Sequence, residues 1–222
     1  MPTPAAELGL LDDESTIEVM IYDVQQGSMD EAVIAFQEAF ADFRPEGFSV
    51  LFAAADQNHH RLIWAHRYEK DFDLTGRFYL GKYPQLVHCL WGGTRFDAVA
   101  AAEDLAKSSA TATTSRPVRT LQHLADGPTV ELKIYKVRDG HWEPFLNCWR
   151  AIVRLRQAAG FKVEFAVADV PGRRFVWGVS LDGDFASQNT AYLEGEDRLA
   201  ANVISDHIER FEIPKVLYIP VP

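Results

Sequence analysis

Three consecutive polar residues interrupt a segment that otherwise has the composition of a buried β-strand. Segment 62–68 reads L-I-W-A-H-R-Y and carries His66, Arg67 and Tyr68. Because side chains alternate along a strand, His66 and Tyr68 share a face with Trp64. A histidine can act as a general base near neutral pH, and a tyrosine hydroxyl can donate a hydrogen bond to a developing oxyanion. The segment therefore predicts an acid/base pair, with Trp64 and Arg67 as substrate-binding neighbours.

An internal duplication singles these residues out. Shifted by 113 residues, segment 17–80 aligns with 130–193 without a gap, and 18 of its 64 positions are identical. In the second copy His66 and Tyr68 are replaced by Val179 and Leu181. An unsatisfied polar group in such an apolar environment costs about 1–3 kcal/mol. The two residues are therefore interpreted either as a hydrogen-bonded pair within the core or as the wall of a cavity that meets water or substrate.

Positions that both copies share are better explained by folding, since both copies must fold. This interpretation covers four pairs of aligned residues: Glu18 and Glu131, Tyr22 and Tyr135, Trp64 and Trp177, and Asp71 and Asp184. A tyrosine hydroxyl near a cavity can still be recruited for catalysis, which keeps Tyr22 as a candidate.

An aromatic-rich stretch, about residues 81–95, has no counterpart in the second copy and contains His88. It is interpreted either as a lid that brings His88 toward His66 or as an insertion that only packs. The candidate catalytic residues are thus His66, Tyr68, Tyr22 and His88, and the candidate substrate-binding residues are Trp64, Trp91, Tyr83 and Arg67.

The sequence does not predict a metal site. His59 and His60 lie in a polar turn without an H-x-x-x-H spacing or an evident carboxylate partner. Cys89 and Cys148 lack a C-x-x-C spacing, which predicts buried free thiols in a reducing cytoplasm.

Charge and hydropathy narrow the possible partners. Lys and Arg number 22 against 32 Asp and Glu, a formal net charge of -10. Such a surface repels phosphate backbones, so nucleic acid is not expected as a partner. No run approaches the roughly 20 apolar residues of a transmembrane helix, and the N-terminus lacks the features of a signal peptide. We expect a cytoplasmic protein without membrane attachment.

Each copy predicts the same opening elements. The first copy predicts a strand at Ile17–Val24, an amphipathic helix from Met29 to Phe43 with Ser28 as its N-cap, and a hairpin of strands Phe48–Ala55 and Leu62–Tyr68. Beyond the aligned region the first copy predicts a helix at Phe96–Ala106, a loop at 108–117 and a fourth strand at Val118–Leu124. The second copy predicts a helix from about Asp197 to Phe211 and a last strand at Val216–Ile219.

The order βαββαβ is that of a ferredoxin-like domain. The expected organisation is a flexible arm at 1–15, a first repeat at 16–126 and a second repeat at 127–222. A four-stranded antiparallel sheet with both helices on one face leaves its other face uncovered. Two copies in one chain can bury those faces against each other, so the expected fold class is α+β: two fused ferredoxin-like repeats in an eight-stranded antiparallel barrel flanked by helices.

These features resemble the dimeric α+β barrel superfamily, and within it the NIPSNAP-like and EthD-like families. The residues that carry the resemblance are E-L-K-I-Y-K-V-R-D-G-H-W-E-P-F at 131–145, G-F at 160–161, R-F-V-W-G-V-S at 174–180 and D-F-A-S-Q-N-T-A-Y at 184–192. The resemblance implies a pocket between sheet and helices, where relatives include cofactor-free monooxygenases, cyclases, lactone isomerases and haem proteins. In the haem-binding relatives a helical histidine that faces the sheet holds the iron, and His207 is the corresponding candidate here.

The resulting hypothesis is an enzyme without a metal or organic cofactor that performs acid/base chemistry of the lyase, cyclase or isomerase type. Its substrate would be a hydrophobic, aromatic or polyketide-like small molecule. His66 would be the acid/base and Tyr68 the oxyanion or orientation partner. The alternatives are a cofactor-free monooxygenase, a haem-dependent enzyme of the same fold, and a non-enzymatic binding or stress-related barrel. Fusion of two copies allows a monomer, and the outer surfaces allow a homodimer.

Overall fold

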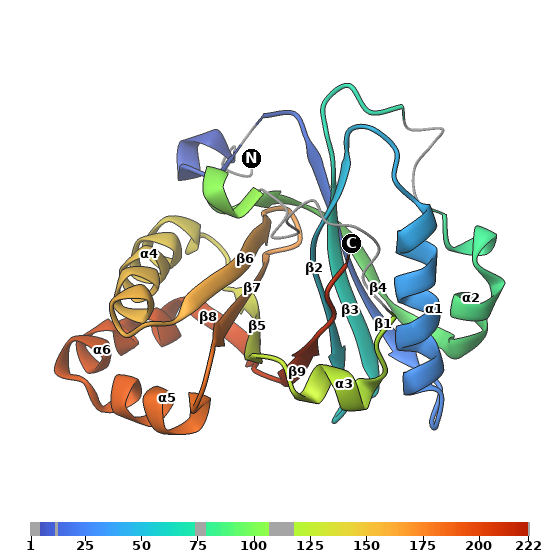
Figure 1. Ribbon diagram of the computed structural model, residues 1–222. Helices are drawn as coiled ribbons and strands as arrows, with labels where there is room; N and C mark the ends of the chain where they lie inside the picture. Colours follow the sequence, from blue (N-terminus) through green and yellow to red (C-terminus); the bar gives the residue numbers. More distant parts are fainter. Residues whose placement is uncertain (1–4, 12, 74–78, 107–117, 222) are drawn as a thin grey trace. The chain divides into compact units, whose positions relative to one another are not determined.

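The computed structural model describes residues 5–11, 13–73, 79–106 and 118–221, which form two compact units (Figure 1). The first unit is built from Asp13–Ala98, Ala106–Gly127 and Val216–Pro222. The second unit is built from Met1–Asp12, Val99–Leu105 and Pro128–Lys215. Each unit therefore holds one copy of the duplicated sequence together with short segments from elsewhere in the chain. Among the described residues, no helix is both long and apolar enough to cross a membrane.

The first unit carries an antiparallel sheet in the order β4-β1-β3-β2-β9. Helix α1 packs against α2 beside this sheet (Figure 1). The strands are β1 (Thr16–Val24), β2 (Phe48–Asp56), β3 (Arg61–Tyr68), β4 (Leu90–Ala100) and β9 (Lys215–Tyr218). The helical segments are α1 (Met29–Asp42), η3 (Leu80–Lys82), α2 (Pro84–Cys89) and α3 (Leu121–Ala125).

The second unit carries an antiparallel sheet in the order β8-β5-β7-β6. The last residues of β4, Val99 and Ala100, belong to this unit and pair with β6. The strands are β5 (Thr129–Val137), β6 (Lys162–Asp169), β7 (Arg174–Leu181) and β8 (Ile208–Glu212). The helical segments are η1 (Ala6–Leu8), η4 (Glu103–Ala106), α4 (Trp142–Ala158), α5 (Phe185–Glu194), α6 (Glu196–Ala200) and η5 (Ala201–His207).

The backbone reproduces the duplication in detail. β1 and β5 begin and end at aligned residues, and so do β3 and β7. The register of the β2–β3 pair shifts between Val50 and Phe52, and that of the β6–β7 pair shifts at the aligned positions. The aligned turn residues His60 and Arg173 both have positive φ, 52° and 56°. The two copies can therefore be compared position by position.

Alternation along the strands turns one face of each sheet toward the helices. In the first unit Trp64 of β3 packs on Phe36 of α1, with 5.2 Å between ring centroids. In the second unit the aligned residues, Trp177 and Trp149, are 6.0 Å apart. All four residues are buried. The predicted amphipathic helices and hairpin strands thus form the helix–sheet layer of each unit.

The prediction of a helix at Phe96–Ala106 is wrong for most of its length. The chain forms β4 up to Ala100, paired with β1, and only the last four residues make the 3-10 turn η4. Phe96 and Ala98 are buried whereas Arg95 and Asp97 are exposed. This period of two marks a strand. Alanine content was therefore the weaker signal, and alternation the stronger one.

The stretch predicted as an insertion at 81–95 supplies α2 and the first half of β4, the second helix and fourth strand of the unit. Leu86 and Cys89 of α2 are buried in the same core as α1. The predicted strand Val118–Leu124 is wrong, because this segment contains α3. The Asp30 carboxylate accepts a hydrogen bond from the Leu121 backbone N–H at 2.8 Å, which stabilises the start of that helix. The predicted loop 108–117 lies outside the described residues.

The predicted helix from Asp197 to Phe211 is also wrong in its second half. The chain passes from α6 through η5 into β8, which pairs with β5. Pairing with β5 satisfies backbone groups that a longer helix would have satisfied internally. The predicted strand Val216–Ile219 is confirmed as β9 within one residue. Ser28 precedes α1 as predicted, but its side chain makes no capping bond.

The described part of the N-terminal arm is anchored, although composition suggested a flexible arm. Leu8 and Leu10 are buried in the core of the second unit. Arg150 of α4 donates a hydrogen bond to the backbone oxygen of Leu8 at 2.7 Å. Burial of two apolar side chains and one charge-assisted hydrogen bond both favour the ordered arm.

Candidate functional site

The first unit buries a glutamate and a histidine side by side. Glu18 on β1 and His66 on β3 are opposite one another in register, and both are fully buried. His66 Nε2 lies 2.9 Å from Glu18 Oε2, and Arg95 of β4 donates to Glu18 Oε1. Burial raises the pKa of Glu18, but the hydrogen bonds and charges of His66 and Arg95 outweigh it and hold that pKa below its usual value. The Glu18 carboxylate is therefore ionised, and its negative charge is balanced by its hydrogen-bond partners.

Aromatic rings surround His66. The ring centroids of Phe48 and Tyr68 lie 5.2 and 5.0 Å from that of the imidazole. Tyr68 is 1% exposed. Trp64 is fully buried and stacks on Tyr22 with 5.4 Å between centroids. The structure thus places four of the predicted site residues on the helix-facing side of one sheet: Tyr22, Trp64, His66 and Tyr68. The rings of His66 and Tyr68 lie next to each other there.

The other predicted site residues lie elsewhere in the first unit. Arg67 points from the face of β3 opposite His66 and pairs with the carboxylate of Asp13. Trp91 is 70% exposed on β4, and His88 is exposed at the end of α2. Tyr83 is half-buried where α2 begins, and burial together with the charge of Asp42 raises its pKa.

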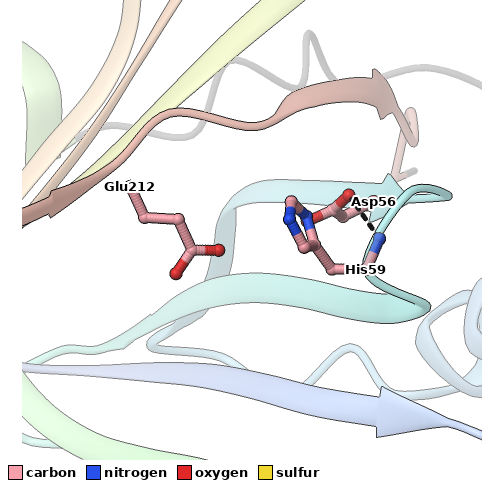
Figure 2. Close-up of side chains that lie close together, drawn as sticks. All are labelled: Asp56, His59 and Glu212. Atoms are coloured by element: carbon pink, nitrogen blue, oxygen red, sulfur yellow. Dashed lines mark hydrogen bonds and ion pairs between the residues drawn. The ribbon is translucent and has the colours of Figure 1, made fainter.

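The turn histidine His59 has a carboxylate partner that the sequence pattern did not reveal. Its Nδ1 lies 2.8 Å from Asp56 Oδ2, while its side chain remains 51% exposed. Figure 2 shows the two side chains next to one another. Asp56 also accepts from Arg61, and the aligned pair Asp169–Arg174 makes the same contact at 2.7 Å. The shared ion pair belongs to the hairpin turn of both copies. Both cysteines carry free thiols, as expected, but only Cys89 is buried and Cys148 is half-buried.

The second unit contains a buried cationic cluster that the sequence analysis missed. Lys133 of β5 is 5% exposed, and its Nζ donates to the carboxylate of Glu131 on the same strand face. Arg156, at the end of α4, is 3% exposed and places Nη2 3.6 Å from Glu131 Oε2. Trp177 lies opposite Lys133 in register, with 5.5 Å between Nζ and the ring centroid.

Two tyrosines and a second arginine complete this cluster. Tyr135 lies two residues beyond Lys133 on the same face of β5. Tyr192 of α5 lies under the Arg156 guanidinium, with 3.9 Å from Cζ to the ring centroid. Arg198 of α6 lies against the same ring at 5.7 Å. We call Glu131, Lys133, Tyr135, Arg156, Tyr192 and Arg198 the cationic cluster.

The electrostatics of the cluster suit proton transfer. Burial lowers the pKa of Lys133 to about 8, with the charge of Glu131 opposing the shift and that of Arg156 adding to it. Burial raises the pKa of Tyr135 to about 12, so its hydroxyl stays protonated. A lysine that loses its proton near pH 8 can serve as a base, and a protonated tyrosine can donate a hydrogen bond to an oxyanion.

The duplication contained the signal for this cluster. Lys133 aligns with Met20, and Arg156 aligns with Phe43. These are positions where the second copy departs toward polar chemistry, the same criterion that selected His66 in the first. Both lie within segments dominated by apolar periodicity, where a long basic side chain is commonly read as a solvated residue. Burial of the charged end is a tertiary property.

His207, the candidate haem ligand, ends the 3-10 segment η5 rather than lying within a helix. It is half-buried, and its Nδ1 lies 3.1 Å from Nδ1 of His141. The helical geometry that the resemblance implies for a haem ligand is therefore not met at this residue.

Comparison with known proteins identifies likenesses of fold only. No family model matches the sequence, and no curated protein matches it. A candidate monooxygenase from Lactobacillus acidophilus superposes with a TM-score of 0.60 at 8% identity, covering 92% of this chain and 94% of the other. An anthrone oxidase-like protein superposes with a TM-score of 0.61 at 12% identity, covering 94% and 92%. A candidate monooxygenase from Fusobacterium nucleatum gives a TM-score of 0.57 at 12% identity, covering 94% of both chains.

These solved structures match nearly the whole chain, and each unit has the antiparallel sheet and helices expected of a ferredoxin-like repeat. The fold class expected from the sequence is thereby confirmed. This chain has the α+β fold of these solved structures, with two ferredoxin-like repeats in a single polypeptide.

Proposed function

We propose that this protein is an enzyme that removes a proton from an acidic aromatic small molecule, and that the cationic cluster of the second unit is its active site. The observation that carries the proposal is the buried Lys133 amine, whose pKa is lowered to about 8 beside Glu131. Perturbed pKa values of this kind concentrate at functional sites. No metal or organic cofactor takes part in the proposed reaction.

Each member of the cluster has a role in this reaction. Neutral Lys133 accepts the proton, and the Glu131 carboxylate stabilises the ammonium ion that forms. The Tyr135 hydroxyl donates a hydrogen bond to the oxyanion into which the substrate charge delocalises. Trp177, beside Lys133, offers an aromatic face to the substrate ring.

The solved structures of similar fold favour oxygenation over a cyclase or isomerase reaction. Two are described as candidate monooxygenases and one as anthrone oxidase-like. Deprotonation of the methylene of an anthrone gives a carbanion that combines with O2 to form a peroxide. The Lys133 ammonium returns its proton to the peroxide. Loss of the second methylene hydrogen as a proton then breaks the O–O bond, leaving anthraquinone and one water. The substrate supplies all the electrons, so no other reductant is required.

Anthrone is therefore the probe for the first experiment, with anthraquinone formation and O2 consumption measured above the rate in buffer. The variant Lys133→Met carries the residue that the first copy has at the aligned position, Met20. We expect it to fold and to lose about 100-fold or more in rate, the usual contribution of a general base. Because catalysis needs neutral Lys133, wild-type activity should rise with pH toward about 8 and level off above it.

A second measurement separates deprotonation from oxygenation. Under argon in D2O, wild-type protein should accelerate exchange of the anthrone methylene hydrogens, and Lys133→Met should not. Exchange without oxidation would leave the proton-transfer proposal standing and return the reaction to the cyclase or isomerase class. If the protein catalysed neither exchange nor oxidation of anthrone or its hydroxylated derivatives, the proposal would be overturned.

The second candidate site is the Glu18–His66 pair, favoured by its 2.9 Å hydrogen bond, which orients the imidazole as a base would be oriented. In this alternative His66 is the acid/base, Tyr68 the oxyanion partner, and Tyr22 and His88 second members. The matched variant is His66→Val, the residue of the second copy. Loss of activity in folded His66→Val, with activity retained in Lys133→Met, would move the active site to the first unit.

A further inference from the structure

Two guanidinium groups of the cationic cluster have hydrogen-bonding capacity that the described part of the chain does not use. Arg156 donates to Asn189 Oδ1 at 2.6 Å and approaches Glu131, but its Nε is buried without a hydrogen bond in the described residues. Arg198 Nε is likewise buried without one there. A buried donor that is charged and lacks an acceptor is costly, so an acceptor is expected beside these atoms.

The charges call for an acceptor that is negative. Lys133, Arg156 and Arg198 face a single carboxylate within the cluster, that of Glu131, and Lys133 lies closest to it. The charges of Arg156 and Arg198 both act on Lys133, on Tyr135 and on the Tyr192 hydroxyl. The cluster therefore carries two positive charges in excess of its own carboxylate. An anion placed between the arginines would offset both the excess charge and the unused donors.

The surroundings of the arginines are aromatic. The Arg156 guanidinium lies 3.9 Å from the Tyr192 centroid and 4.5 Å from that of Phe161. Phe211 of β8 lies opposite Tyr135 in register, so it projects from the same sheet face, and it is 65% exposed. An exposed aromatic side chain on the rim of a buried charged cluster suits a flat ring that carries an anionic group.

We infer that Arg156 and Arg198 bind the carboxylate of an aromatic acid. This inference rests on the proposed function for the location of the site and names the class of substrate that the site takes. The ring lies toward Phe211 and Trp177, and the carboxylate accepts from the two guanidinium groups. The negative charge thus sets the orientation in which Lys133 meets the acidic hydrogen.

The test is calorimetric binding of 2-naphthoate at pH 7, compared with its neutral isostere 2-naphthamide and with inorganic phosphate. Wild-type protein should bind 2-naphthoate at least about tenfold more tightly than either, which is the effect of one charge-assisted hydrogen bond or more. Two variants should each weaken the binding of 2-naphthoate by about tenfold. They are Arg198→Gln, at a half-buried position, and Arg156→Phe, which introduces the residue of the first copy. Neither variant should weaken the binding of 2-naphthamide by as large a factor.

Arg95→Gln is the matched control, because Arg95 is the arginine that contacts the aligned glutamate of the first unit. It should leave 2-naphthoate affinity unchanged. Equal affinity for 2-naphthoate and 2-naphthamide, equal affinity for phosphate, or equal losses in Arg95→Gln and Arg198→Gln would each overturn the inference. Arginine-dependent binding without anthrone chemistry would support the inference and count against the proposed function. Lys133-dependent turnover without arginine-dependent binding would do the reverse.

Discussion

The two units neutralise the same glutamate in different ways. Glu18 and Glu131 occupy aligned positions on β1 and β5. Glu18 is held by His66 and by Arg95, whose side chain is 46% exposed and keeps its hydration. Glu131 is held by Lys133 and Arg156, both almost fully buried. The first arrangement lets the cation stay in water, whereas the second removes two cations from it.

We propose that this difference separates a structural arrangement from a chemically active one. A carboxylate with one histidine and one solvated arginine is satisfied at low cost. A carboxylate that faces two buried cations, with a third nearby, leaves an excess of charge in a layer of low polarity. Burial lowers the pKa of Lys133, the charge of Arg156 adds to that shift, and an excess of positive charge attracts anions. Folding requires none of these properties. The duplication reveals this difference, because the first unit has Met20 and Phe43 at the positions of Lys133 and Arg156.

The largest effect should come from removing the carboxylate in each unit. Glu131→Gln leaves Lys133 and Arg156 buried without a counter-charge, and we expect it to lower the free energy of unfolding at pH 7 by about 3–5 kcal/mol. Glu18→Gln leaves Arg95 solvated and weakens the hydrogen bond to His66, and it should cost about 1–2 kcal/mol. Urea titrations of both variants measure the two values. Equal losses would break the comparison between the units.

An intermediate effect should appear in the pH dependence of stability. The pKa of Lys133 is about 8 in the folded protein and 10.5 as a free side chain. Between pH 8 and 10 the unfolded chain retains a proton that the folded protein has lost, so stability should rise with pH. The rise due to this group is at most about 3 kcal/mol. Unfolding of wild-type protein and Lys133→Met at pH 7, 8, 9 and 10 measures it as their difference. Parallel curves would show that Lys133 is not perturbed.

The smallest effect should be the same in both units. Asp56–Arg61 and Asp169–Arg174 are aligned ion pairs at 2.7 Å, each with a buried carboxylate. Arg61→Gln and Arg174→Gln should each lower the free energy of unfolding by about 1 kcal/mol, because a hydrogen bond to a charge is lost but the glutamine remains polar. The midpoints of urea unfolding give the comparison. Values that differ by more than about 1 kcal/mol would show that even the shared frame has diverged.

Much of the fold could be predicted because its signals are local and appear twice. Strand alternation, the helical stripe of α1 and the turn before β3 each involve neighbours in sequence, and the second copy repeats them. The errors fell where the copies diverge. Phe96–Ala106 was assigned by its alanine content, and only pairing with β1 makes most of it a strand. The end of the segment Asp197–Phe211 became β8 because an edge of β5 was open to it.

The candidate site could be predicted only in part, for a related reason. The sequence alone shows that His66 replaces a valine and Lys133 a methionine, since that needs only the alignment of the two copies. It does not show which charges meet. His66 acquires Glu18 from another strand, and Lys133 and Glu131 acquire Arg156 from the end of α4. Burial, counter-charge and pKa depend on neighbours distant in the chain, because desolvation and Coulomb forces act through space and not along the backbone.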